Sequence, residues 1–220
     1  MHTVVVGTQK GGSGKSTLAT GLAVAAIESG QRVGIIETDP QGTVSNWGRR
    51  RGLSEPCIVR VSNEIEIKRA LMRLKRDGCT LTIIDTAPTH NALGMSAIRA
   101  ADLCLIPARP SPADIEAALP TLTAIRKLGK PFAFVLNQAP VRSFRLSEAA
   151  TALNAVGVLA FPFIAQRNDH QDALGAGLAV TEFAPEGKAA DEIRNLWRWV
   201  WDKLTVKIAD HENTPIRAAS

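Results

Sequence analysis

The chain has 220 residues, a length that suits one α/β domain or at most two small ones. Its hydrophobic content of 45% predicts a substantial core, and its aromatic content of 5% makes that core mostly aliphatic. A net charge of +5 mildly favours acidic partners such as nucleic acid. The three cysteines suit neither a disulfide framework nor a metal site, and no apolar stretch approaches a membrane span, so we expect a soluble cytoplasmic protein without membrane binding.

The first elements are a strand, a glycine loop and a helix. Residues 3–6 form a short apolar run, residues 10–17 read Lys-Gly-Gly-Ser-Gly-Lys-Ser-Thr, and an Ala/Leu-rich helix is expected from Gly14 to Ser29. Glycines let a loop curl with its N–H groups towards phosphate oxygens, and the helix start adds a positive dipole end. Lys15 should neutralise β- and γ-phosphate charge, and the Ser16 hydroxyl should ligate Mg²⁺. This context favours a phosphate site over a glycine turn without ligand.

The next strand, residues 32–36, ends in Glu37-Thr38-Asp39, where ligands bind at the carboxyl ends of parallel strands. A short helix is expected over 43–51, anchored by Trp47. The basic run 49–51 at its exposed end is interpreted as a solvated charge cluster in preference to a binding site. A weak strand follows at 57–61. A helix that opens with capping chemistry at residues 62–65 should run to about Asp77.

A buried strand at 81–84 ends in Asp85, whose carboxylate should hold Mg²⁺ through water. Further along the chain, strands are expected at 103–107, 132–136 and 158–161. Residues 110–114 should lead into a helix that ends at Leu128, and further helices are expected from about 143 to 155 and from about 188 to 204. The alternation predicts an α/β fold with three layers, in which helices cover both faces of a mostly parallel sheet. We expect a single domain over 1–208 and a polar, disordered tail over 209–220.

The motif at residues 10–17 resembles that of the ParA/MinD family of deviant-Walker P-loop ATPases, and the whole chain is most similar to short ParA-type partition ATPases. Residues 38–42 resemble the second acidic motif of that family, and residues 84–88 resemble its Walker B strand end. The segments 166–177 and 187–192 resemble the C-terminal part of short ParA proteins. The resemblance covers about residues 3–204.

The resemblance implies an ATPase with ATP and Mg²⁺ as cofactors and an ATP-dependent sandwich homodimer. Lys10 would reach the partner's nucleotide, Asp39 would orient the attacking water near Mg²⁺, and Asn137 would read adenine. Most members have Asp where this chain has Glu37. Because Glu is longer by one methylene, the resemblance does not say which group the Glu37 carboxylate contacts. The implied nucleotide contacts are Gly11, Gly12, Ser13, Gly14, Lys15, Ser16, Thr17 and Asn137; the implied metal-binding residues are Ser16, Asp39 and Asp85; and the implied catalytic residues are Lys10, Lys15 and Asp39.

Short ParA proteins bind DNA without sequence preference as ATP dimers and release it when a ParB-like or other partner stimulates hydrolysis. By this resemblance the protein would be bacterial and nucleoid-associated, with a role in plasmid or chromosome partition or in cargo positioning. Arg167, Lys188, Arg194 and Arg198 are the expected DNA contacts, with pairing of Arg194 to Asp191 or of Arg198 to Asp202 as the alternative. A metabolic ATP-dependent ligase or kinase of the same fold is the alternative function.

Overall fold

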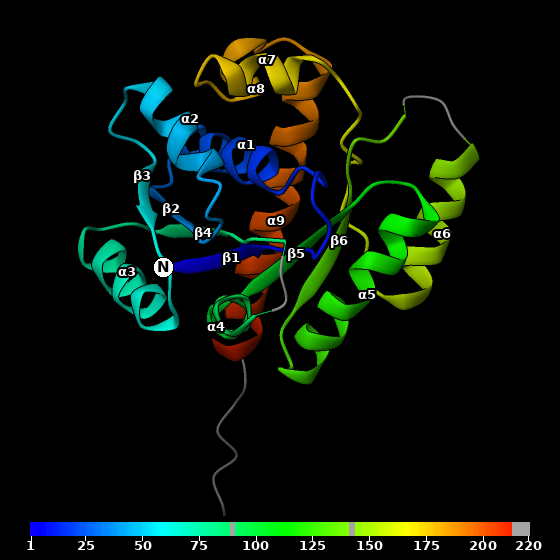
Figure 1. Ribbon diagram of the computed structural model, residues 1–220, viewed down its shortest axis with the longest axis horizontal. Coiled ribbons are helices and arrows are strands. Elements are labelled where there is room, and N and C mark those ends of the chain that lie inside the picture. The colour runs from blue at the N-terminus through cyan, green and yellow to red at the C-terminus, as the bar shows by residue number, and fades with distance from the viewer. Residues whose placement is uncertain (89–90, 141–143, 213–220) are drawn as a thin grey trace, which may run out of the picture.

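The computed structural model describes residues 1–88, 91–140 and 144–212. The described strands form one six-stranded parallel sheet in the order β3-β2-β4-β1-β5-β6 (Figure 1). The sequence prediction of a parallel α/β sheet is confirmed. The strands are β1 (His2–Val6), β2 (Val33–Glu37), β3 (Cys57–Arg60), β4 (Leu81–Asp85), β5 (Leu103–Ala108) and β6 (Phe132–Leu136).

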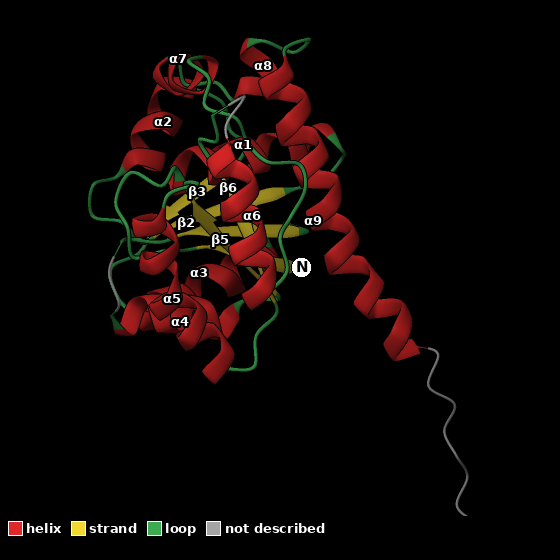
Figure 2. Cartoon of the chain, turned by 90° about the vertical axis from the view of Figure 1, so that its right-hand side faces the viewer, coloured by secondary structure: helices red, strands yellow, loops and turns green. Residues whose placement is uncertain are grey.

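Helices lie on both faces of this sheet, as Figure 2 shows. One face carries an aliphatic core that includes Leu22 and Trp197, and the other carries a core that includes Leu74 and Leu122. The helices are α1 (Lys15–Glu28), α2 (Thr43–Arg51), α3 (Glu64–Arg76), α4 (Ala92–Ala100), α5 (Pro112–Lys127), α6 (Phe144–Val156), α7 (Asp169–Gly175), α8 (Val180–Phe183) and α9 (Lys188–Glu212). None of the described helices has the length and apolarity needed to cross a bilayer.

The register of the central strands brings three loop starts to one edge. β4 lies between β1 and β2, and Asp85 pairs with Val6 on one side and Glu37 on the other. The glycine loop therefore leaves the sheet beside the acidic ends of β2 and β4. Trp47 is fully buried and its Nε1 donates to the Leu178 carbonyl at 3.0 Å, which confirms it as the anchor of α2.

Three expectations need correction. The expected strand at 158–161 makes an isolated parallel bridge, Phe134 to Leu159, because its backbone bonds β6 only around Phe134 and does not bond it again until Ile164. The short helices α7 and α8, and helix α4, were not anticipated. Helix α9 continues to Glu212, eight residues beyond the expected Leu204 and into the expected tail. Residues 213–220 of that tail, and Ser143 at the expected start of α6, lie outside the described residues.

Candidate nucleotide-binding site

The glycine loop folds back on itself between β1 and α1. Gly12 and Gly14 have φ angles of +72° and +83°, in the left-handed region that favours glycine. Gly14 is also closely approached, since a Cβ there would collide with the Asn137 amide. No side chain caps the start of α1, so its first N–H groups remain for a ligand. The local sequence thus builds the phosphate cradle that its spacing predicts.

Lys15 begins α1 and is buried at 7% exposure. Its Nζ donates to the Lys10 carbonyl at 3.0 Å, across the mouth of the loop. Burial lowers the pKa of Lys15, and the nearby carboxylates of Asp85 and Asp39 act in the opposite direction. A single neutral carbonyl is an exchangeable partner, so phosphate oxygens could take its place and form stronger, charge-assisted bonds.

Ser16 and Asp85 meet at the end of β4. The Ser16 hydroxyl donates to Asp85 Oδ2 at 2.7 Å. Asp85 is fully buried, and burial raises its pKa to about 7 against the lowering effects of Ser16 and Lys15. Asp85 Oδ1 has no hydrogen-bond partner among the described residues. An orphaned buried acceptor beside a hydroxyl fits a hydrated Mg²⁺, whose bound water would donate to that oxygen.

Asp39 lies on the loop that follows β2, half-buried at the edge of a groove of about 690 Å³. Its Oδ1 accepts the Gln41 backbone N–H at 2.9 Å, which leaves the other oxygen free of contacts with described residues. Its charge influences both Lys15 and Asp85. A carboxylate held this way at a groove beside the phosphate loop can orient a water molecule.

The structure shows which groups the Glu37 carboxylate contacts, at the position where most family members have Asp. Its buried carboxylate accepts the N–H groups of Val44 at 2.7 Å and Ser45 at 3.1 Å, and also the Ser45 hydroxyl. These are the first N–H groups of α2, and the N-cap residue Gly42 has no side chain to bond them. The longer side chain therefore caps α2 from the end of β2. Arg60 lies near it, with Nε 3.7 Å from Glu37 Oε2.

Lys10 is held by a carboxylate of its own chain. Lys10 Nζ lies 3.0 Å from Asp114 Oδ2, and Asp114 also accepts from Arg109 Nε at 3.0 Å and from the Ser111 hydroxyl at 2.5 Å. Asp114 is buried at 4% exposure, whereas the Lys10 side chain is 30% exposed. Desolvation opposes these three bonds, but the net pKa of Asp114 is lowered, so it stays ionised. Lys10 thus lies at the rim of the loop in an ion pair with Asp114, and a second anion could compete with Asp114 for its ammonium group.

Asn137 joins the loop to a second pocket. Its amide Nδ2 donates to the Ser13 carbonyl at 2.8 Å, and the neighbouring Gln138 donates to the Gly12 carbonyl at 3.0 Å. The pocket beside them has a volume of about 100 Å³. Its lining includes Gly14, Thr17, Asn137, Gln138, Ile164, Gln166, Arg167 and His170. Because its lining includes Gly14 and Thr17, this pocket adjoins the start of α1 and the end of the glycine loop.

The family model for the CobQ/CobB/MinD/ParA nucleotide binding domain matches residues 4–180. The chain belongs to this family. It is 30% identical over 205 residues to the maintenance of carboxysome distribution protein A of Gloeobacter kilaueensis, covering 91% of this chain and 93% of that one. It is 28% identical to the protein ParA of Rhizobium radiobacter, covering 74% and 78% of the two chains.

The fold also matches a ligand-bound member of another functional class. Cobyrinic acid a,c-diamide synthase from Mycobacterium smegmatis, solved with a bound ATP analogue and magnesium, superposes with a TM-score of 0.75 at 16% identity. The match covers 94% of this chain and 96% of that structure. At this identity the likeness concerns the fold alone.

In this ParA/MinD-type chain, the predicted loop residues, Asp39, Asp85 and Asn137 gather at one edge of the sheet. The expected DNA contacts do not form one cluster with them. Arg167 pairs with Glu192 at 2.7 Å and lines the pocket next to Asn137, so its guanidinium is committed to the interior. His170 in the same pocket has a buried Nε2 without a hydrogen-bond partner among described residues, and burial is the main cause of its lowered pKa.

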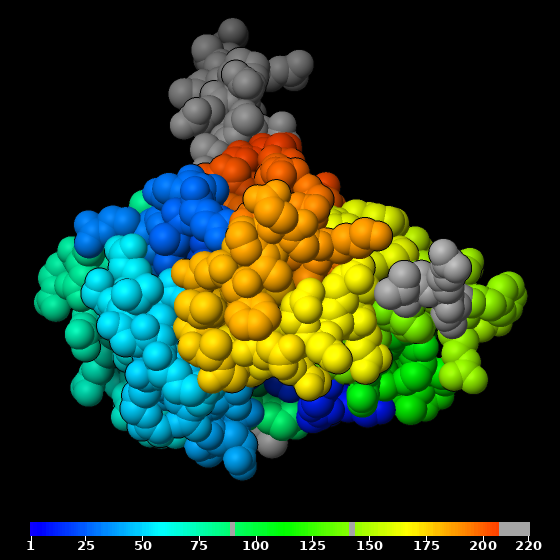
Figure 3. Space-filling view, turned by 90° about the horizontal axis from the view of Figure 1, so that it is seen from above, coloured from blue at the N-terminus to red at the C-terminus, as the bar shows by residue number. Residues whose placement is uncertain are grey.

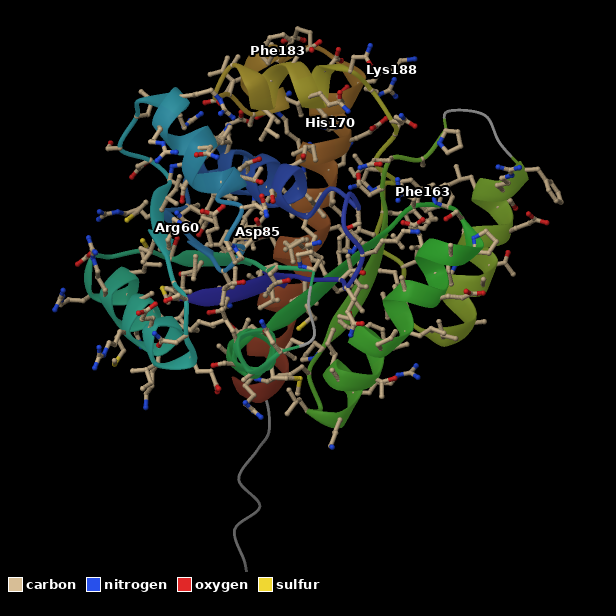
Figure 4. The ribbon with its side chains drawn as sticks, in the orientation of Figure 1. Arg60, Asp85, Phe163, His170, Phe183 and Lys188 are labelled. Atoms are coloured by element: carbon tan, nitrogen blue, oxygen red, sulfur yellow. The ribbon has the colours of Figure 1, made fainter. Side chains whose placement is uncertain are left out.

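The other three expected DNA contacts lie on α9. Arg194 bonds Glu28 at 3.0 Å and the carbonyls of Pro185 and Thr181 at 2.6 and 3.0 Å, rather than pairing with Asp191. Arg198 bonds Asn195, not Asp202, and is exposed. Lys188 is exposed at the start of α9 (Figure 4). Figure 3 shows the face of the molecule on which α2, α7, α8 and the start of α9 meet.

Sequence reasoning missed Asp114, His170 and the capping role of Glu37. Asp114 was visible only as part of a helix start, since the Ser111 side chain accepts its N–H at 3.2 Å. Its partner Lys10 is 104 residues away, so no local pattern could join the two. His170 lies in a seven-residue helix whose position is set by packing.

Proposed function

We propose that the chain is an ATP- and Mg²⁺-dependent switch ATPase that forms a sandwich dimer, binds DNA without sequence preference and is released by partner-stimulated hydrolysis. In this proposal Lys15 and the loop N–H groups bind the phosphates. Ser16 ligates Mg²⁺ and the orphaned Oδ1 of Asp85 accepts from its water. Mg²⁺ would supply neutralising charge on the β- and γ-phosphate oxygens. Asp39 positions the attacking water.

The observation that carries the proposal is the position of Lys10, the lysine that precedes the glycines of the loop. Lys15 already serves its own phosphate site, whereas Lys10 lies at the exposed rim, held only by Asp114. A partly exposed lysine that is ion-paired with a carboxylate beside a phosphate loop can exchange that partner for another anion. The γ-phosphate of a partner chain would be such an anion when two loops face each other. The Lys10 ammonium would then stabilise charge that one chain alone leaves uncompensated.

DNA binding would use the exposed cations Lys188 and Arg198, which stay accessible, doubled by the dimer. Arg167 and Arg194 would act indirectly by holding the α7–α9 region in place, because their guanidinium groups are bonded inside the chain. Positioning of cargo on bacterial DNA would follow from such a cycle. The name of one relative points to a carboxysome as the cargo, in the bacterial cytoplasm; a plasmid or a chromosome is the alternative cargo.

A second candidate is a metabolic ligase or kinase, favoured by the groove of about 690 Å³ beside Asp39. Its lining includes Asn91, Arg60 and Ser62, which could hold a small polar substrate. Steady-state ATPase assays separate the two proposals. We expect a weak basal rate that rises on adding duplex DNA together with the protein encoded beside this gene. A rate that responds only to a small-molecule acceptor, with a phosphorylated or ligated product, would favour the metabolic enzyme.

A further inference from the structure

The outer face of α3 carries the densest group of cations among the described residues. Between residues 68 and 76 the helix has Lys68, Arg69, Arg73, Lys75 and Arg76 and no acidic residue, and all five are exposed. We call these five residues the α3 basic face. They span about 12 Å of helix at 1.5 Å per residue. Over that length duplex DNA carries about seven phosphate charges.

The cations of this face have few hydrogen bonds or ion pairs with described residues of the chain. Lys68, Arg69 and Lys75 make no hydrogen bond or ion pair with described residues. Arg73 and Arg76 have only Asp77, at 3.5 and 3.7 Å, and these exposed contacts contribute little. This distinguishes them from Arg194 and Arg51, whose guanidinium groups are bonded to buried or half-buried partners. A free surface guanidinium keeps its donors for an external anion.

The spacing arranges four of the five residues of the α3 basic face in two rows. Lys68 and Lys75 are seven residues apart, as are Arg69 and Arg76, so each pair lies on one line about 10 Å long on the helix. The opposite side of α3 packs on the sheet through Ile67, Ala70 and Leu74. Because the apolar side of α3 is buried against the sheet, the two rows face solvent.

Arg32 extends the surface at the end of α3. A Cβ at Gly78 would lie 2.9 Å from the Arg32 Nη1, which places this guanidinium beside the last turn of the helix. Favourable interaction with the helix dipole explains cations in the last turn, but not Lys68 and Arg69 in its middle. The pattern therefore exceeds what stabilising the helix needs.

We propose that the α3 basic face binds the phosphate backbone of duplex DNA, in the monomer as well as in the dimer and without need of ATP. It is a surface separate from the one that Lys188 marks: α3 lies at the β3 edge of the sheet, far from α7, α8 and Lys188 (Figures 1 and 4). This inference rests on the proposed function in taking DNA as the polyanion. In the monomer this hold is weak, and because dissociation of the dimer halves the number of phosphate contacts, hydrolysis still releases the chain from DNA.

The composition of the face favours DNA over an anionic membrane. Its apolar side chains are Ile65 and Met72, at 65% and 56% exposure, and they are separated by two turns. A membrane-surface helix needs a broad apolar face turned to the lipid, and the apolar face of α3 is turned to the sheet. Isolated exposed aliphatic residues are common on ordinary protein surfaces.

The test is fluorescence anisotropy of a short labelled duplex of mixed sequence, titrated with full-length protein over a series of salt concentrations. The variant is Arg69→Glu with Arg76→Glu. Its matched control is Arg126→Glu with Lys127→Glu, exposed cations in the last turn of α5 that give the same change of net charge. Thermal unfolding of both variants verifies that they are folded. Each protein is measured without nucleotide and with a slowly hydrolysed ATP analogue.

We expect the α3 variant to lose about tenfold in affinity, with a salt slope smaller by about two, in both nucleotide conditions. The control should stay within about twofold of the parent. An unchanged affinity in the α3 variant overturns the proposal, and so does an equal loss in both variants, which would reflect net charge alone. Binding of the parent to phosphatidylserine vesicles but not to the duplex would also overturn it.

The same data separate this proposal from the ATP switch. If the ATP analogue leaves the parent's DNA affinity unchanged while the α3 variant still loses binding, the switch fails and the α3 basic face stands. If the analogue raises affinity and the α3 variant behaves like the parent in both conditions, the switch stands and the α3 basic face fails.

Discussion

The phosphate loop and helix α9 both contain cations that the sequence predicts to bind anions. The two regions differ in how many partners within the chain each cation has. Among the described residues, the side chains of Lys15 and Lys10 each have one hydrogen-bond partner: a carbonyl for Lys15 and a carboxylate oxygen for Lys10. Arg194 has three partners, which tie α9 to α1 and to the segment around α8. A cation with one replaceable partner is poised for a ligand, whereas a cation with three is part of the scaffold. The four predictions below test this difference.

The largest effect should come from Lys15→Ala. The substitution removes a cation from a buried site that also contains the carboxylates of Asp85 and Asp39, so phosphate would enter an anionic pocket without compensation. We expect ATP affinity to fall by about a thousandfold. Isothermal titration calorimetry with Mg²⁺ present measures this loss. Tight ATP binding by the folded variant would show that Lys15 is a scaffold cation.

Asp39→Ala should separate binding from hydrolysis. Asp39 contacts only the Gln41 N–H among described residues, so its loss leaves the phosphate contacts in place. We expect ATP binding within about twofold of the parent and a turnover rate lower by about a hundredfold. Single-turnover hydrolysis beside a binding titration measures both. A variant with weakened binding and normal turnover would assign Asp39 to the metal instead of the water.

Arg194→Ala should act on stability. The loss of three hydrogen bonds, one of them to Glu28, should reduce the free energy of unfolding by about 2 kcal/mol. Arg198→Ala, which removes an exposed cation, should change it by less than about 0.5 kcal/mol. Urea unfolding measures both variants. Equal stabilities would place Arg194 with the replaceable cations and remove the contrast between the two regions.

Asp85→Asn should give the smallest effect, and one that depends on pH. The pKa of Asp85 is raised from 3.8 to about 7, so the folded chain keeps a proton that the unfolded chain releases. Stability of the parent therefore falls as pH rises between those values and levels off above them. Without metal or nucleotide, we expect the variant to gain about 5 °C in Tm over the parent at pH near 8, and less at pH near 5. A gain independent of pH would contradict the burial of an ionised carboxylate.

Local pattern explains what could be predicted from the sequence. The strand, loop and first helix follow from residues adjacent in the chain, and Gly12 and Gly14 adopt the left-handed angles that the loop requires. Asp85 was predictable because a strand end leaves its side chain at the edge of the sheet. The partners of those residues were not, since the pairs Lys10–Asp114 and Arg194–Glu28 join residues far apart in the chain.

Two further differences have physical causes of the same kind. The capping of α2 by Glu37 depends on how far its side chain reaches across a turn, which residue type alone does not state. The apolar face of α9, which includes Trp197 and Leu204, predicts a helix that ends at Leu204, whereas the helix runs to Glu212. Backbone hydrogen bonds carry the helix onward after that face stops.

The central claim is that Lys10 leaves Asp114 to bind the nucleotide of a second chain. Multi-angle light scattering with a slowly hydrolysed ATP analogue tests it on the parent, Lys10→Ala and Asp114→Asn. We expect the parent to shift from monomer to dimer, Lys10→Ala to remain monomeric although it binds nucleotide, and Asp114→Asn to dimerise at about tenfold lower protein concentration. Dimerisation of Lys10→Ala at the same concentration as the parent would contradict the account.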